Sequence, residues 1–291
     1  MERNDTLIRT RNLVISLAIF VALALYASTY SEPVLRVSLI PDESPSVVRR
    51  KLKPLTDYLE KKIGMKIEFR PMPDGGALVD ALIDNKLDMV WFDGFGFIRV
   101  EARSKDMVIP LVQRAEDEKT RSVFVTRRED IRNLEDLKGK IFSFGAETSV
   151  SGHLMPRTYM QAAYIHPETD MQSVFSGTPE ATLAAVASGK TDAGVLSNLA
   201  LEKLIGQDLV DAKVVHVFFT TPDYHDYNWS VRADMDINLR LKLTDAFLAL
   251  DKNVGLDKEI LHLQHASKFI PAHAENYTVI ESAARRAGLL K

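Results

Sequence analysis

The chain has 291 residues, of which 46% are hydrophobic and 26% are charged, and its formal net charge is −3. This length suffices for one large domain or two medium domains with cores of their own, and the charge balance offers no basic surface for nucleic acid. The absence of cysteine excludes disulfides, thiolate metal ligands, thiol catalysis and lipid attachment to an N-terminal cysteine.

The N-terminus has the pattern of an export signal. Arginines precede an uncharged run from Leu13 to Ala27, and a basic region before a short apolar region is typical of a secretory signal peptide. The charge-free stretch 12–31 is also just long enough to cross a bilayer. Residues 1–31 are therefore predicted to be a signal peptide or an N-terminal membrane anchor, with residues 13–31 as the tether in the second case. Both alternatives place the rest of the chain in the periplasm.

The first exported elements alternate between strand and helix. Val34–Ile40 is predicted to be a strand that ends at Pro41. Ser44 and Pro45 then have the pattern of a helix start, and Gly64 that of a helix end. A strand at 66–71, a loop at 73–76, a helix from Ala77 and a strand at 88–92 follow. This alternation, with short connections, indicates a mostly parallel sheet with helices on both faces.

The later elements continue the pattern. The expected strands are 109–113, 122–126, 141–144, 172–175 and 214–219, with a short helix at 133–140 and a longer one at 154–164. The strands at 122–126 and 214–219 are candidates for the two crossings between lobes. From Asn238 to Lys291 the pattern predicts helix, with Leu241, Phe247 and Leu248 in the core.

The chain repeats one pattern at an offset of 104 residues. Ala77–Asp93 aligns without a gap against Ala181–Ser197, and both segments read as an amphipathic helix, a Lys-x-Asp turn and an apolar strand. The same offset pairs Ser44 with Thr148. We therefore predict an α/β fold of two lobes, each a mixed sheet flanked by helices, that closes on a ligand. The expected boundaries are 32–122 plus 220–291 for lobe 1 and 123–219 for lobe 2.

Ligands of open α/β sheets bind at the carboxyl ends of the strands, beside helix N-termini. The candidate ligand-binding residues on this rule are Pro41, Asp42, Gly75, Asp93, Gly94 and Phe95 in lobe 1, and Thr148, Ser149, Val150, Ser151, Gly152, His153, Thr178, Glu180 and Ser197 in lobe 2. The segment 147–156 has the strongest pattern, because three hydroxyls and a glycine stand at a helix start where free amides favour anions. The alternative is ordinary hydroxyl capping of a surface helix.

Other polar and aromatic residues leave alternatives open. His153 could donate a hydrogen bond, respond to pH or bind a metal, although no second ligand stands at metal-site spacing. Tyr224 and Tyr227 belong to an aromatic cluster that either walls the cleft or packs as a loop. Trp91 and Phe92 are expected in the core. Either Phe95 or Phe97 is expected to face the ligand. We expect solvated faces at His225, Asp226, His262 and His265. No cofactor or catalytic motif is found.

With these segments in hand, the chain resembles the phosphate, phosphite and phosphonate-type solute-binding proteins of ABC transporters, and is most similar to the branch labelled selenate-binding. The segments that carry the resemblance are 36–42, 51–55, 64–66, 111–118, 151–157, 220–229 and 269–271. The resemblance implies a two-lobe Venus-flytrap protein that grips a small oxyanion with its serine-rich helix start.

The chain departs from the family pattern at three positions. Gly75-Gly76 stands where the family places a ligand-facing tyrosine, Pro179 where it often has a histidine, and Asp93 adds a carboxylate where a small residue is usual. These changes should weaken binding of a fully ionised oxyanion and favour a neutral or protonated ligand, or one with its own amine.

The predicted function is capture of a small oxyanion, such as phosphonate, phosphite, phosphate or a selenate-like ion, for an ABC permease in the cytoplasmic membrane. The alternative is a periplasmic sensor that signals to a membrane histidine kinase. An enzyme on the same scaffold is disfavoured, because no nucleophile and base pair is recognisable. We expect a monomer that binds no nucleic acid and no cofactor.

Overall fold

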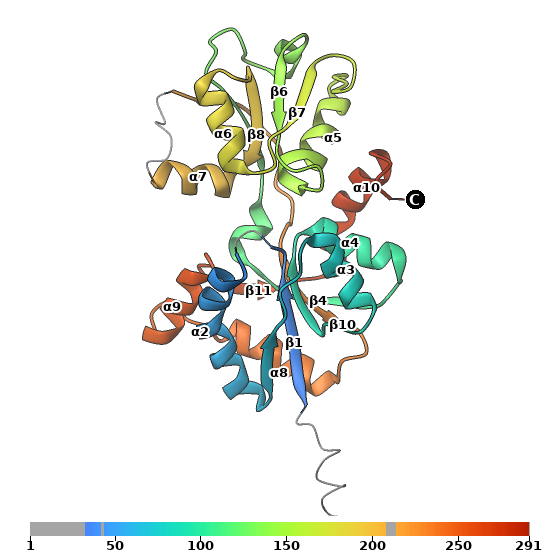
Figure 1. The fold of residues 1–291 in the computed structure, drawn as a ribbon, viewed down its shortest axis with the longest axis vertical. Helices are drawn as coiled ribbons and strands as arrows, with labels where there is room; N and C mark the ends of the chain where they lie inside the picture. The colour runs from blue at the N-terminus through green and yellow to red at the C-terminus, as the bar shows by residue number, and fades with distance from the viewer. Residues whose placement is uncertain (1–32, 42–43, 208–213, 291) are drawn as a thin grey trace, which may run out of the picture. The chain divides into compact units, whose positions relative to one another are not determined.

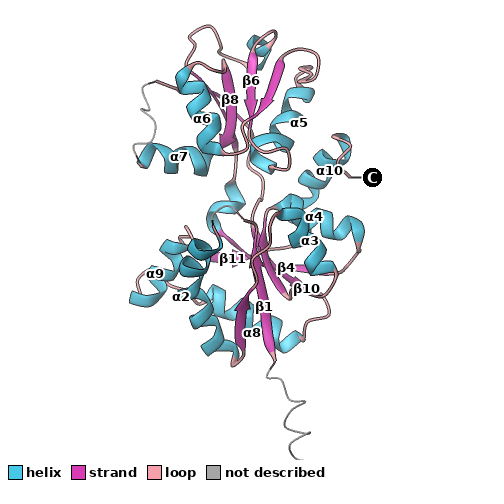
Figure 2. Cartoon of the chain, in the orientation of Figure 1, coloured by secondary structure: helices cyan, strands magenta, loops and turns pink. Residues whose placement is uncertain are grey.

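The computed structural model describes residues 33–41, 44–207 and 214–290, which form two mixed β-sheets flanked by helices (Figure 2). The first sheet has the strand order β11-β4-β10-β3-β1-β2. Its strands are β1 (Val34–Leu39), β2 (Lys66–Phe69), β3 (Met89–Phe92), β4 (Val108–Arg114), β10 (Asn228–Arg232) and β11 (Phe269–Pro271). β1 runs parallel to β3, whereas β10 is antiparallel to both β3 and β4. The predicted fold class is confirmed.

Helices cover both faces of the first sheet (Figure 1). One buried cluster joins the sheet to α2 (Pro45–Ile63), α8 (Ile237–Leu248) and α9 (Gly255–Leu263). A second cluster joins it to α3 (Gly75–Ile83), α4 (Gly94–Arg103) and the C-terminal α10 (Thr278–Arg286). The ends of α2 are as predicted, with Ser44 at the N-cap and Gly64 in the left-handed conformation at φ 72°.

The second sheet has the order β7-β6-β8-β5-β9 and is formed by residues 122–220. Its strands are β5 (Ser122–Thr126), β6 (Ile141–Phe144), β7 (Gln172–Phe175), β8 (Ala193–Ser197) and β9 (His216–Thr220), and its helices are α5 (Met155–Ala162), α6 (Pro179–Ser188) and α7 (Asn198–Gly206). Three short 3₁₀ helices, η1 (Ala115–Lys119), η2 (Leu134–Leu137) and η4 (Ala274–Tyr277), and a π-helical turn, η3 (Val150–Leu154), complete the described elements. The chain enters this sheet between β4 and β5 and leaves it between β9 and β10.

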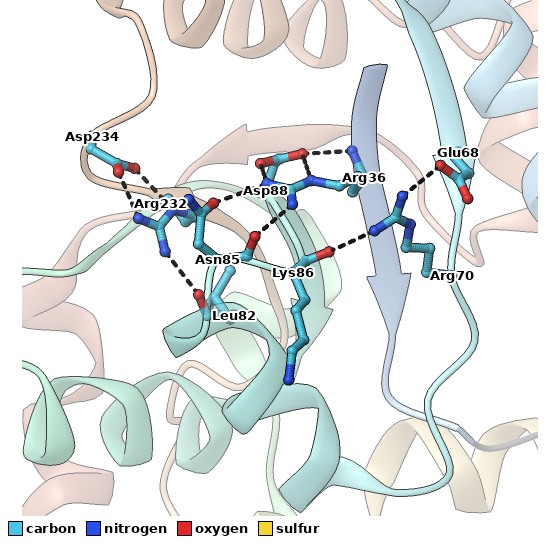
Figure 3. A network of polar contacts seen from close by, with 9 residues as sticks. All are labelled: Arg36, Glu68, Arg70, Leu82, Asn85, Lys86, Asp88, Arg232 and Asp234. Atoms are coloured by element: carbon cyan, nitrogen blue, oxygen red, sulfur yellow. Dashed lines mark hydrogen bonds and ion pairs between the residues drawn. The ribbon is translucent and has the colours of Figure 1, made fainter. Parts of the chain in front are cut away.

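The sequence repeat corresponds to a structural repeat. Asp88 Oδ2 accepts the amide of Arg36 at 2.7 Å, and Asp192 Oδ2 accepts the amide of Ile141 at 2.8 Å. Each aspartate therefore ties the strand that follows its own helix, β3 or β8, to the neighbouring parallel strand. Figure 3 shows Asp88 and Arg36 in this network.

The helix N-caps also coincide at the offset of 104 residues. In the first half, Asp74 Oδ1 accepts from Ala77 N and Asp93 Oδ1 accepts from Gly96 N, both at 2.8 Å. In the second half, Thr178 Oγ1 and Ser197 Oγ cap α6 and α7 in the same way, both at 3.1 Å. The first half thus caps these two helices with carboxylates, and the second half caps them with neutral hydroxyls.

The structure corrects the predicted C-terminal region. It is not helical throughout, because β11 extends the first sheet beside β4. The predicted core position of Phe247 is confirmed, but Leu241 and Leu248 are not core residues: their exposed fractions are 56% and 39%, because α8 turns Leu243 and Phe247 towards the core. Strand β2 also ends at Phe69, before the predicted limit.

Candidate ligand-binding site

The helix start at residues 148–153 is shaped by a π-helical turn. Ser149 is its N-cap, and Ser149 Oγ accepts the amide of Gly152 at 3.0 Å. The Gly152 carbonyl in turn accepts the amide of Gly145 at 2.9 Å, which holds the turn against the end of β6. The amides of Val150 and Ser151 lie in the first turn and have no partner found within the described residues. Free amides of this kind are suited to bind an anion.

This turn is packed against the first half of the chain. Val150 and Leu154 are buried in the same cluster as residues of α4 and α10. Thr148 is exposed, and Ser149 and Ser151 are half-buried. The turn is therefore anchored by its apolar side chains, while its hydroxyls stay accessible.

A small cavity of about 20 Å³, room for roughly one water-sized group, lies where the two halves meet. The residues that line it are Ile40, Gly75, Leu78, Phe92, Asp93, Phe95, Gly96, Arg99 and Thr148. Eight of the nine belong to the first half, at the ends of β1 and β3 and along α3 and α4, and Thr148 belongs to the turn of the second half.

The structure brings four of the predicted site residues together around this cavity: Gly75, Asp93, Phe95 and Thr148. Thr178, Glu180 and Ser197 lie at the starts of α6 and α7 and do not line it. Pro41 is exposed at the end of β1, and Asp42 lies outside the described residues. Gly94 is buried, and a Cβ atom there would stand 2.4 Å from Ile280 Cδ1.

His153 positions the turn. Its Nδ1 lies 2.7 Å from the Glu147 carbonyl oxygen, so the ring donates a hydrogen bond across the turn. Burial lowers the pKa of His153 below its ordinary value, which favours the neutral ring. The ring also packs edge-on against Phe144 and Phe175, with centroids 5.0 and 4.9 Å away. Of the predicted alternatives, the hydrogen-bond donor is the one that the geometry supports.

The two tyrosines of the aromatic cluster have different surroundings. Tyr224 is buried, and its hydroxyl lies 2.8 Å from Ser122 Oγ. Burial raises the pKa of Tyr224 well above its ordinary value, although hydrogen bonds with Ser122 and Ser151 act the other way. Tyr224 thus connects the start of β5 to the turn. Tyr227 stacks on Trp91, with ring centroids 5.6 Å apart.

Two buried carboxyls lie at the start of α4. Asp93 is 7% exposed and Asp226 is 2% exposed, so the predicted solvated position of Asp226 is wrong. Its loop folds inward because its amide donates to the Asp117 carbonyl. Burial raises the pKa of Asp93 to about 6, and burial together with the charge of Asp93 raises the pKa of Asp226 well above its ordinary value.

Sequence reasoning missed Arg99, which lines the cavity with its guanidinium 5.8 Å from the Phe95 ring centroid. The spacing i, i+4 to Phe95 on one helix face was an available signal. Ile40 and Leu78 were missed because apolar lining residues are read from sequence as core.

Within the described residues, no cluster of acidic residues and histidines has the arrangement of a metal site, and no helix is long and apolar enough to cross a membrane. The N-terminal segment for which a signal peptide or anchor is predicted lies outside the described residues.

Comparison with known proteins identifies the class of the protein. The profile of the family described as "ABC transporter, phosphonate, periplasmic substrate-binding protein" matches residues 37–277. The chain belongs to this family. It is therefore a two-lobe, periplasmic-type substrate-binding protein of an ABC transporter, and its relatives are binding proteins, not enzymes.

Individual relatives agree with this assignment. The probable ABC transporter phosphite binding protein PhnD1 of Prochlorococcus marinus is 28% identical over 93% of this chain and 97% of its own length. A structure of PhnD1 in complex with methylphosphonate has a TM-score of 0.78 to this chain at 29% identity, covering 88% of this chain and 98% of that one. The phosphonates-binding periplasmic protein of Escherichia coli is 25% identical over 66% of this chain and 58% of its own length.

Proposed function

We propose that the protein captures a small tetrahedral oxyanion of the phosphonate, phosphite or phosphate type in the periplasm and delivers it to an ABC permease. The observation that carries this proposal is the turn at residues 148–153. Its Thr148 lines a cavity that the first half also lines, and the amides of Val150 and Ser151, two and three residues further on, have no partner found within the described residues. An anion bound there would touch both halves and would favour the closed arrangement by its differential affinity. The methylphosphonate complex of the relative PhnD1 supports this ligand class.

The proposed lobes are residues 32–122 plus 220–291 and residues 123–219. The strands of the two sheets divide in the same way along the chain, which supports these boundaries. We also propose that the ligand is bound by the residues predicted in the turn, which are Thr148, Ser149, Val150, Ser151, Gly152 and His153, and by the predicted residues that line the cavity in the first half, which are Gly75, Asp93 and Phe95. We further propose that the protein acts as a monomer, which light scattering of the purified protein would check.

The ligand class is tested by thermal unfolding with methylphosphonate, phosphite, phosphate, sulfate and selenate. A ligand at 1,000 times its dissociation constant should stabilise the native state by about 4 kcal/mol. We expect a marked rise in melting temperature with at least one phosphorus oxyanion. If none of these anions moves the transition, the proposed function is wrong.

The turn itself is tested by the double variant Ser149→Ala, Ser151→Ala. Loss of two hydrogen bonds at about 1–1.5 kcal/mol each should weaken binding of methylphosphonate at least tenfold in calorimetry. Ser188→Ala is the matched control, because that exposed hydroxyl bonds only to carbonyls of its own helix. Unchanged affinity in a folded double variant would exclude this turn as the anion site.

A sensor that remains tethered by residues 13–31 is the second candidate, and the uncharged stretch at 12–31 favours it. Sequencing the N-terminus of the mature protein separates cleavage from retention. Co-purification with a permease rather than a histidine kinase would support transport.

A further inference from the structure

Asp93 follows β3, caps α4 and lines the cavity that Thr148 of the second half also lines. The role inferred for it below rests on the proposed function. An oxyanion bound at the turn beside Thr148 would therefore have oxygens near the Asp93 carboxyl. Two oxygens approach within hydrogen-bond distance only if one of them carries a proton, because ionised carboxylates and oxyanions are acceptors alone.

The surroundings of Asp93 leave part of its carboxyl available. Within the described residues, the one hydrogen bond found for this side chain joins Oδ1 to the amide of Gly96 at 2.8 Å. From its own helix, Arg99 faces it with a positive charge that favours the ionised form. Arg99 itself lies over the Phe95 ring and makes no ion pair found among the described residues.

A second buried carboxyl, that of Asp226, lies close enough to Asp93 to interact with its charge. Asp226 Oδ1 has no hydrogen-bond partner found in the described part of the chain, although the residue is only 2% exposed. The Gly94 amide bonds to the same carboxyl. Asp117, which also faces Asp226, is neutralised by an ion pair with Arg114 at 2.6 Å. Two neighbouring buried carboxyls are not both ionised readily. Asp226 is the more buried of the two and has an unpartnered oxygen, so burial favours the proton on Asp226 and the negative charge on Asp93, whose Oδ1 accepts from Gly96.

We propose that Asp93 makes the site selective for tetrahedral oxyanions that carry a proton, so that the ligand donates its hydroxyl to this carboxylate and fully ionised anions are rejected. Phosphorus oxyanions fit this requirement, since the second pKa of a phosphate group is about 6 and a protonated monoanion is present near neutral pH. Sulfate and selenate are fully ionised there and offer no proton. A like charge placed against a desolvated anion disfavours its binding.

Calorimetry with methylphosphonate, sulfate and selenate tests this proposal. The wild-type protein should bind methylphosphonate at least a hundredfold more tightly than either of the other anions at pH 7.5. Its affinity for methylphosphonate should fall at pH 9, where the ligand loses its proton. Below pH 6 the discrimination should shrink, because a protonated Asp93 can donate to sulfate.

Two variants at Asp93 remove the charge and keep the helix cap. Asp93→Asn and Asp93→Ser both retain a good N-cap, and serine is the residue that caps α7 at the equivalent Ser197. Both variants should gain at least tenfold in affinity for sulfate and selenate and lose most of the dependence on pH. Asp74→Asn is the matched control, because Asp74 caps α3 with the same geometry but is exposed and does not line the cavity.

The outcomes are distinguishable. Wild-type protein that binds selenate or sulfate as tightly as methylphosphonate would overturn the proposal, as would Asp93 variants that still reject both anions. If neither the wild type nor any variant binds any of the anions, the proposed function fails and this inference fails with it.

Discussion

Asp88 and Asp192 show how one residue type can hold the same position in both halves. Each lies in a Lys-x-Asp turn, and each accepts the backbone amide of the neighbouring parallel strand. Asp88 also receives the Arg36 side chain through Nε at 2.8 Å (Figure 3). The identical spacing in the sequence therefore reflects a shared backbone requirement, and these two aspartates lie apart from the cavity-lining residues.

Replacement of Asp88 by alanine tests this structural role. The variant leaves the Arg36 amide without its acceptor, so we expect the free energy of unfolding to fall by about 1–3 kcal/mol, measured by urea titration. Asp84→Ala should cost at most about 1 kcal/mol, because its ion pair with Lys86 is exposed on both sides. Equal losses in the two variants would show that the strand contact has no special importance.

At the scale of elements, the two halves differ in the side chains that cap their helix starts. The first half caps α3 and α4 with Asp74 and Asp93, and these carboxylates already occupy the positive helix ends. The second half offers hydroxyls and free amides at the turn of residues 148–153. In the proposed site, the anion-binding turn therefore belongs to the second half, and Asp93, which we propose accepts the ligand's proton, belongs to the first.

Gly152 is required by the close approach within the turn. A Cβ atom there would stand 3.0 Å from Ser149 Oγ and 3.2 Å from Gly145 Cα. Gly152→Ala should displace the Ser149 cap and weaken methylphosphonate binding at least tenfold in calorimetry. It should also cost about 1–3 kcal/mol of stability, as overpacking usually does.

Gly206→Ala is the control for this variant, because nothing lies within 4 Å of a Cβ atom at that position. Affinity equal to wild type in Gly152→Ala would mean that the turn tolerates rearrangement or that the ligand binds elsewhere.

The sequence predicts these elements well where local chemistry defines them. Ser44, Pro45 and Gly64 bound α2 by capping rules alone, and the repeat correctly pairs α3 and β3 with α6 and β8. The burial of Asp226 and the exposure of Leu241 could not be predicted, because both depend on which neighbour packs against the element. The general position of ligands in α/β sheets predicts a ligand-binding role for Asp93, which lines the cavity, but gives no indication of Arg99 one turn further along α4.

At the scale of the whole molecule, the two halves are connected by more than the two crossings. The C-terminal helix α10 packs against α4 of the first sheet and also against α5 and the turn η3 of the second half. Ile280 and Ala284 share one buried cluster with Val150 and Leu154. Any closing motion that a ligand favours must preserve this apolar contact or exchange it for another, which ties α10 to the energetics of binding.

The buried carboxyls also connect the site to the stability of the molecule. Asp93 and Asp226 have pKa values raised by burial, so the folded state binds protons that the unfolded state releases. Stability that these groups contribute in acid is therefore lost as the pH rises above the ordinary aspartate pKa of about 4.

We expect Asp226→Asn to gain stability relative to wild type as the pH rises from 4.5 to 9, measured by urea unfolding without ligand. For Asp234 we expect the opposite dependence of stability on pH, because hydrogen bonds from Arg232 lower the pKa of its carboxyl. Asp234→Asn should therefore lose stability relative to wild type as the pH rises from acid. A difference between Asp226→Asn and wild type that is constant across this range would show that Asp226 has the same protonation state in the folded and unfolded chains.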